Sequence, residues 1–260
     1  MKVRAIWLIA RSVLIEAVRR KEIYAIVLVS CGLIALTMSL DFFQLSGLDK
    51  FYREVALKTM SIATALTCIV LATRQLPREF EMRTIYPLLA RPISRLTFLM
   101  GKLAGVVLAS AFCFGLFMTI FLLGTWRLGG AIHWGLFGQY LYLQMVMIVL
   151  LASLSFLLSM LLNLDAAICV GVLFFAIAST YTSMLTYLYE FATSAGRVGL
   201  LVLNYGIPQV SLFDLSSKAV HAEVWTPLGW GVMGALTLYG LIFSAAYAGA
   251  ATLLFRRRAL

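Results

Sequence analysis

Residues 135–161, GLFGQYLYLQMVMIVLLASLSFLLSML, form the stretch that decides the fold of this protein. The stretch contains no Asp, Glu, Lys, Arg or His. A helix of about 20 apolar residues is long enough to cross the roughly 30 Å hydrocarbon core of a bilayer. These residues therefore predict a transmembrane helix.

The rest of the chain has the same character. Of its 260 residues 62% are hydrophobic and 12% are charged, and the mean hydropathy is +0.97. A soluble domain is about 45–50% apolar and about 25% charged, so we predict an all-α polytopic membrane protein. Six transmembrane helices are expected, at roughly 23–41, 54–73, 98–125, 135–161, 166–188 and 228–255.

Residues 1–21 are predicted to form an N-terminal amphipathic helix in the membrane interface, ahead of a transmembrane domain at 22–260. On a helical wheel the charged residues share one half and the apolar residues the other, as in interfacial helices. A signal peptide is the weaker interpretation, because the apolar run from Ile23 to Leu40 has no small-residue cleavage motif.

The distribution of positive charge predicts the topology. The net charge is +10, and most of the lysines and arginines fall in residues 1–21, 74–102 and 256–258. Basic residues collect on the cytoplasmic side of membrane proteins, so both termini are expected in the cytoplasm. Nucleic acid is not an expected partner, because no basic motif is interleaved with aromatic residues. Aromatic residues gather at the predicted outer ends of the spans, at Phe42, Phe43, Phe51, Tyr52, Trp126, Trp134, Tyr187, Tyr189, Trp225 and Trp230.

Residues 189–227, before the last span, are predicted to lie outside. They include two apolar patches, Val198–Leu203 and Val210–Leu215, each too short to cross a membrane. We expect re-entrant or interfacial short helices that cap the outer face, rather than a plain flexible loop.

Several kinds of chemistry have no support in the sequence. The central parts of the third, fourth and sixth spans lack ionisable residues, which argues against a proton-coupled carrier. No catalytic residue and no metal site are predicted, since His133 and His221 belong to no ligand motif and the four cysteines show no CxxC spacing. The chain also lacks the phosphate-loop motif G-x-x-x-x-G-K-[ST], so ATP would have to bind to another subunit.

The basic segment at 76–97, predicted to be cytoplasmic, has the features of a docking element. Pro77 suits the start of a helix, with Glu79 and Glu81 in its first turn. Ile85, Leu88 and Leu89 would form an apolar stripe that fits a groove on a soluble partner. A topology anchor that contacts anionic lipids is the alternative.

Two prolines and a serine set the expected end of the docking helix and the start of the next helix. Pro87 and Pro92 limit the length of the docking helix. Ser94 is expected to be the N-cap of the next helix.

Small residues recur four positions apart in two spans, at Gly101-x-x-x-Gly105 and Gly240-x-x-x-Ser244. Such spacing lets two helices approach closely. Packing within one subunit and a seam between two copies both remain open.

Residues 79–102 resemble the cytoplasmic loop of exporter-type ABC permeases. The matching residues are Glu79-x-Glu81-x-Arg83-Thr84-Ile85-Tyr86-x-Leu88-Leu89, then Arg91-Pro92-Ile93-Ser94-Arg95 and Gly101-Lys102. The nearest subgroup is the one associated with multicopper-enzyme maturation. Pro87 departs from the family pattern, since a helix interior normally excludes it.

The resemblance implies a second permease copy, forming a homodimer, and two cytoplasmic ABC ATPase subunits that carry ATP and Mg. No cofactor is expected in this chain. The implied ATPase contacts are Glu79, Glu81, Arg83, Thr84, Ile85, Leu88, Leu89 and Arg91, with a second contact at Asn163 and Asp165. The expected location is a bacterial or archaeal plasma membrane.

The expected function is therefore that of the membrane subunit of an ABC exporter, and not of an enzyme. One alternative is a scaffold or maturation factor that transmits ATPase motion to an extracytoplasmic partner docked on 189–227. A secondary carrier is the weaker third hypothesis, because the spans lack central charges.

Overall fold

The computed structural model describes residues 2–19, 21–39, 48–81, 94–191, 193, 196–197, 199–200 and 206–257, which form helices and no strand. The prediction of an all-helical fold is confirmed. The helices are α1 (Lys2–Val18), α2 (Lys21–Ser39), α3 (Leu48–Glu81), α5 (Arg95–Arg127), α6 (Trp134–Leu161), α7 (Leu164–Phe191), η2 (Val210–Phe213), α9 (Ser216–Val220) and α10 (Trp230–Arg257).

Four of these helices are long and apolar enough to cross a membrane. Their candidate spans are Asp49–Pro77, Arg95–Arg127, Trp134–Leu161 and Trp230–Phe255. They correspond to the second, third, fourth and sixth predicted spans. The first and fifth predicted spans coincide with α2 and α7, whose apolar helical stretches Ile26–Leu36 and Leu164–Thr180 are shorter than the usual crossing length.

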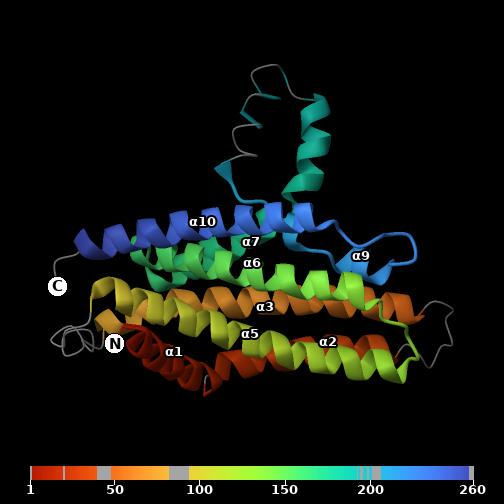
Figure 1. Cartoon of the computed structure of the whole chain (residues 1–260), viewed down its shortest axis with the longest axis horizontal. Coiled ribbons are helices and arrows are strands. Elements are labelled where there is room, and N and C mark those ends of the chain that lie inside the picture. Colours follow the sequence, from red (N-terminus) through yellow and green to blue (C-terminus); the bar gives the residue numbers. More distant parts are fainter. Residues whose placement is uncertain are drawn as a thin grey trace.

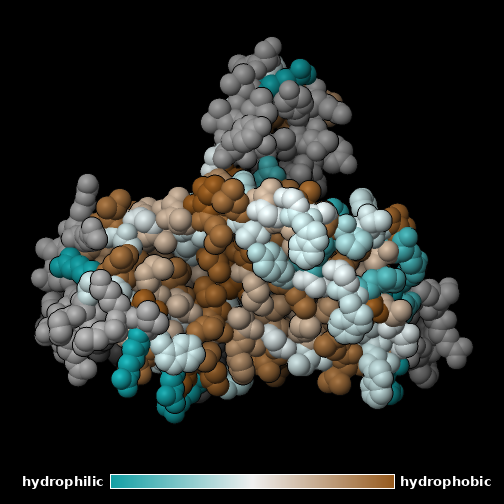
Figure 2. All heavy atoms as spheres, viewed as in Figure 1, coloured by the Kyte–Doolittle hydropathy of each residue, from teal (hydrophilic) through white to brown (hydrophobic). Residues whose placement is uncertain are grey.

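The four long helices run side by side along the long axis of the molecule (Figure 1). α3 packs on α5 and α6, and α10 packs on the other side of α6. The last part of α7 leaves this bundle (Figure 1). Figure 2 shows apolar side chains across the middle of the visible face, with charged side chains toward the two ends.

Different helix ends and connections lie at the two ends of the bundle (Figure 1). We call the end at which α3 ends and α5 begins the loop end; α1 begins there, α10 ends there, and the α6–α7 turn lies there. We call the opposite end, where α3 begins and α9 lies, the cap end. The two short helices η2 and α9 fall within the predicted capping segment 189–227.

A row of aromatic rings fills the core near the cap end. The ring centroids of Tyr52 and Phe121 are 6.4 Å apart, those of Phe121 and Phe137 5.5 Å, and those of Phe137 and Tyr140 6.4 Å. Tyr52 is fully buried and its hydroxyl donates to the carbonyl of Phe121 at 3.4 Å. Tyr52 thus lies near the start of α3, and its ring packs inward between helices instead of facing outward.

α1 is a helix, as predicted, and it packs on the first half of α5. Ala10, Val13 and Ala17 are its buried residues. Trp7, which the helical wheel placed on the apolar half, is 59% exposed. The placement of this helix in a membrane interface stays a prediction.

Candidate functional site

The structure describes the two ends of the predicted ATPase-contact segment, residues 76–81 and 94–97. α3 continues through Pro77 to Glu81, so the expectation that Pro77 begins a helix is wrong. Glu79 and Glu81 lie in the last turn of α3 instead of a first turn. The remaining predicted contacts, Arg83, Thr84, Ile85, Leu88, Leu89 and Arg91, lie outside the described residues.

Tertiary packing explains why α3 continues beyond Pro77. Gln75 and Leu76 are buried immediately before it, so tertiary contacts hold the last regular turn in place. Membrane helices tolerate proline where neighbouring helices support the backbone.

The downstream flank begins with a capped helix. The Ser94 side chain accepts a hydrogen bond from the backbone N–H of Thr97 at 3.2 Å, which confirms its predicted role as N-cap. The Arg95 guanidinium donates to the carbonyl of Phe255 in α10 at 3.4 Å. The rings of Phe98 and Phe255 stack with centroids 6.2 Å apart. The start of α5 is thus joined to the end of α10.

A buried lysine joins α5 to α3 near the same end. Lys102 is 5% exposed, and its ammonium donates to Oε1 of Gln75 at 3.2 Å. It also lies 5.9 Å from the centroid of the Phe98 ring, within reach of a cation–π interaction. The two helices that flank the predicted contact segment are therefore held together by a desolvated polar contact.

The predicted second contact lies at the same end of the bundle (Figure 1). Asn163 is exposed in the turn between α6 and α7, and its carbonyl accepts from the N–H of Ala167 at 2.8 Å. Asp165 is exposed in the first turn of α7, where a carboxylate suits the positive end of the helix. Both side chains are accessible to a soluble partner.

The family model described as ABC-2 family transporter protein matches residues 8–260. The chain belongs to the ABC-2 transporter family. It is thus a membrane subunit of an ABC transporter, and membership implies association with an ABC ATPase. No curated protein matches the chain, and the finer resemblance to multicopper-maturation permeases stays a prediction.

In this ABC-2 permease the first small-residue motif faces α1 of the same chain. A Cβ added at Gly101 would lie 2.9 Å from Cβ of Ile9, and one added at Gly105 would lie 2.6 Å from Cβ of Val13. Real side chains essentially never approach this closely, so α1 and α5 depend on these glycines for their separation.

The second motif faces α6 and η2. A Cβ at Gly240 would overlap the side chain of Val146 and lie 3.2 Å from the ring of Phe213. Ser244 is buried and donates back to the carbonyl of Gly240 at 2.7 Å. A role for either motif in a dimer stays a prediction.

The cap end is held by ion pairs between distant segments. The Lys58 ammonium in α3 pairs with the Asp214 carboxylate after η2. Lys50 pairs with Glu223 at 2.9 Å, with both side chains exposed. Arg53 is buried; it pairs with Asp49 at 3.0 Å and donates to the carbonyl of Ala131 in the α5–α6 connection.

The surroundings of Asp214 favour its ionised carboxylate. Burial alone raises the pKa of its carboxyl, but the hydrogen bonds from Lys58 and Ser216 and the charge of Lys58 outweigh it and lower the pKa below its usual value. The backbone N–H of Ser216 donates to Oδ1 of Asp214 at 3.0 Å. Asp214 therefore fastens the capping segment to α3.

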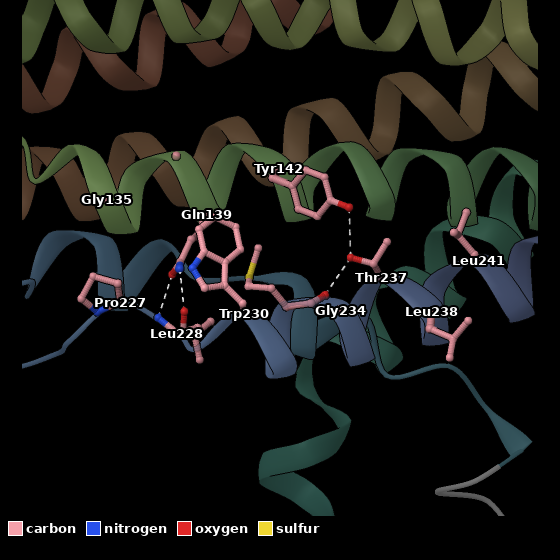
Figure 3. Close-up of a pocket in the computed structure, with 12 residues that line it drawn as sticks. Gly135, Gln139, Tyr142, Pro227, Leu228, Trp230, Gly234, Thr237, Leu238 and Leu241 are labelled. Atoms are coloured by element: carbon pink, nitrogen blue, oxygen red, sulfur yellow. Dashed lines mark hydrogen bonds between the residues drawn. The ribbon is translucent and has the colours of Figure 1, made fainter.

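An open groove of about 860 Å³ lies between α6 and α10 (Figure 3). Gln139 clamps the chain before α10: its Nε2 donates to the carbonyl of Leu228 at 2.8 Å, and its Oε1 accepts from the Leu228 N–H at 2.9 Å. The hydroxyls of Tyr142 and Thr237 lie 3.1 Å apart. Since these polar groups satisfy one another, the groove presents a mainly apolar surface.

A second cavity, of about 350 Å³, lies between α3, α6, α7 and η2. Sequence reasoning found neither this cavity nor the pair of Lys58 and Asp214 at its edge. These two residues are 156 positions apart, and no local pattern connects them. The isolated charges at Lys58, near the start of an apolar run, and at Asp214, inside an apolar patch, were the only available signal.

Proposed function

We propose that this chain is the membrane subunit of an ABC exporter, driven by two ATPase subunits that dock on residues 76–97 and on the α6–α7 turn. The observation that carries the proposal is the pair of ties at the loop end. Arg95 links the start of α5 to α10, and Lys102 links α5 to α3. A displacement of the docked segment would reach three long helices through these contacts.

The mechanism needs no chemistry in this chain. ATP and Mg would bind to the ATPase subunits, whose closure would move the segment between α3 and α5. The helices would then shift together, because a buried ammonium such as that of Lys102 is costly to separate from its acceptor. Two permease copies would face each other as a homodimer and alternate between inward-open and outward-open arrangements.

Six membrane crossings fit the path of the chain, although four helices meet the length and hydropathy of a span. α6 ends at the loop end and α10 begins toward the cap end, so residues 162–229 must return along the bundle (Figure 1). α1 begins at the loop end and α3 begins at the cap end, so α1 and α2 together must run along the bundle from the loop end to the cap end. We propose that α2 and α7 make these two crossings, with both termini in the cytoplasm of a prokaryotic plasma membrane.

The docking role is tested by charge reversal in the predicted contact segment. The double variant Arg83→Glu with Leu88→Ala should abolish co-purification of the ATPase from native membranes and remove stimulation of ATP hydrolysis. Its matched control is Arg127→Glu with Leu123→Ala, which changes exposed residues near the other end of α5. Undiminished association of the ATPase with the first variant would refute the assignment.

A further inference from the structure

Close packing of α7 on α3 lies next to the cavity between α3, α6, α7 and η2. A Cβ added at Gly171 would lie 2.9 Å from Cγ2 of Ile69, so the two helices are in close contact there. Toward the cap end the lining includes Phe175 of α7, Ile62 of α3, and Val210 and Ser211 of η2. The space of about 350 Å³ is lined by residues of α3, α6, α7 and η2 and by Asp214.

The lining of this cavity changes from apolar to polar along its length. Leu66, Met147 and Val172 line its deeper part. Lys58, Asp214 and the hydroxyl-bearing Ser211 line it near η2. An occupant that matches this surface has an apolar chain and a polar head.

The head can be bound by the remaining donors of Lys58, whose positive charge is balanced by the carboxylate of Asp214. Both carboxylate oxygens of Asp214 already accept, one from Lys58 and one from the N–H of Ser216. An ammonium has three donors, and within the described part of the chain Lys58 donates to Asp214 alone. The side chain of Lys58 is 53% exposed against 15% for Asp214, so its remaining donors can be reached by an anionic oxygen.

The depth of Lys58 suits the headgroup region of a bilayer. The Asp49–Pro77 stretch has 29 residues, about 43 Å at about 1.5 Å per residue, which exceeds the roughly 30 Å hydrocarbon core. The charged residues Asp49, Lys50, Arg53 and Glu54 favour placing the excess of about 13 Å at the cap end. Lys58, about 13 Å along the axis from Asp49, then lies near the boundary of that core. Its long side chain can hold the ammonium among phosphates while its stem lies against apolar groups.

We propose that this cavity binds an amphiphile with a phosphate-bearing head and an acyl-type chain, the phosphate on Lys58 and the chain against Leu66, Met147 and Val172. Exposed residues of α3 and α7, among them Ile62 and Ala176, line the cavity, so a ligand can enter from the side. Such an amphiphile is the class of molecule that the proposed exporter would move. Only the transport step rests on the proposed exporter function. Binding of the amphiphile requires the permease chain alone.

The test is native mass spectrometry of the purified full-length permease, without ATPase, titrated with three lipids of equal chain length and with glycerol phosphate. Phosphatidylglycerol and phosphatidylethanolamine should bind at least about tenfold more tightly than diacylglycerol, which lacks phosphate. Glycerol phosphate, which has the head without chains, should not bind. Equal binding of diacylglycerol, or tight binding of glycerol phosphate, would each overturn the proposal.

A pair of neighbouring substitutions separates this cavity from general lipid contact. Ala176→Trp should fill the cavity and reduce phospholipid binding at least about tenfold, whereas Ile177→Trp, on an exposed position that does not line it, should leave binding unchanged. Lys58→Gln should remove the preference for phospholipid over diacylglycerol. Equal lipid binding by the two tryptophan variants would contradict the site, whatever the stability of the Lys58 variant.

The same variants separate the site from the transport hypothesis. If phospholipid binds as expected but ATP and the ATPase move none of it across proteoliposomes, the binding site stands and the exporter assignment fails. If ATP-driven transport persists in Ala176→Trp with phospholipid binding lost, the cavity is not the cargo site.

Discussion

At the scale of single residues, glycine decides how closely the helices of this permease approach. Two glycines of α5 illustrate the difference. Gly105 faces Val13 and the backbone of Ala10, whereas a Cβ at Gly115 would meet nothing within 4 Å. The two positions share a helix and a residue type, so their substitution isolates the effect of contact with α1.

Gly105→Ala should lower the free energy of unfolding by about 1–3 kcal/mol, because the added methyl group overpacks the contact with α1. Gly115→Ala should be neutral or stabilising by up to about 1 kcal/mol, since alanine is the better helix former. Thermal unfolding of the purified variants in one detergent measures both. A loss at position 115 as large as at 105 would contradict the packing of α1 on α5.

Asp214 makes a residue-scale prediction about pH. Its folded-state pKa is lowered, so the unfolded chain binds more protons and stability rises with pH in that range. The contribution is complete above the usual carboxyl pKa of about 4 and is lost as the pH falls through the folded-state pKa. Unfolding midpoints between pH 3 and pH 7 should therefore depend less on pH in Asp214→Asn than in the parent. An unchanged slope in that variant would rule out Asp214 as a source of the dependence.

At the scale of elements, side chains from one helix anchor connections that belong to others. Arg53 of α3 reaches the carbonyl of Ala131 between α5 and α6, and Lys58 reaches the capping segment after η2. The α5–α6 connection is further shaped by Gly129, whose φ of 67° lies in the left-handed region that suits glycine. α3 therefore organises the cap end of the whole bundle.

Arg53→Ala should destabilise the protein by about 1–3 kcal/mol, because it removes charge-assisted hydrogen bonds in a buried setting. Arg127→Ala, at an exposed position at the end of α5, should change stability by less than about 0.5 kcal/mol. Denaturant or thermal unfolding compares the two variants. Proteolysis within 128–133 should also be faster in Arg53→Ala alone, and equal rates in the two variants would weigh against the anchoring role.

At the scale of the whole molecule, the segregation of segments between two ends gives a topology that can be measured. The α6–α7 turn lies at the loop end, and residues 221–229 lie toward the cap end (Figure 1). Because basic residues concentrate in segments assigned to the loop end, that end is expected in the cytoplasm.

Single cysteines test this topology in a background with the four native cysteines replaced by alanine. A membrane-impermeant maleimide should label Thr226→Cys in intact cells and Asn163→Cys only after lysis, since the two exposed positions lie at opposite ends of the bundle. Labelling of Asn163→Cys in intact cells would reverse the orientation. Labelling of both positions in intact cells would mean that residues 163 and 226 lie on the same side of the membrane, and would contradict the crossing proposed between them.

The sequence predicts the long helices well because a continuous apolar run decides both helix and span, as in α6. It does not identify the partner of a small-residue motif: Gly101 and Gly105 indicate close approach, and only the fold shows that α1 supplies the other surface. The misplaced helix start at Pro77 has a similar cause, since the buried contacts of Gln75 and Leu76 come from tertiary packing. The pairing of Lys58 with Asp214 depends on the path of the chain between them, which no local pattern records.

The packing of α1 on α5 also has a consequence for biosynthesis. α1 leaves the ribosome before α5, and the surface that receives it is complete only when Gly101 and Gly105 have been made. At roughly 5–20 residues per second, the intervening stretch of about 90 residues takes on the order of ten seconds to synthesise. During that delay Ala10, Val13 and Ala17 have no α5 to cover them, so the nascent chain must be sheltered by lipid or by the insertion machinery until α5 emerges.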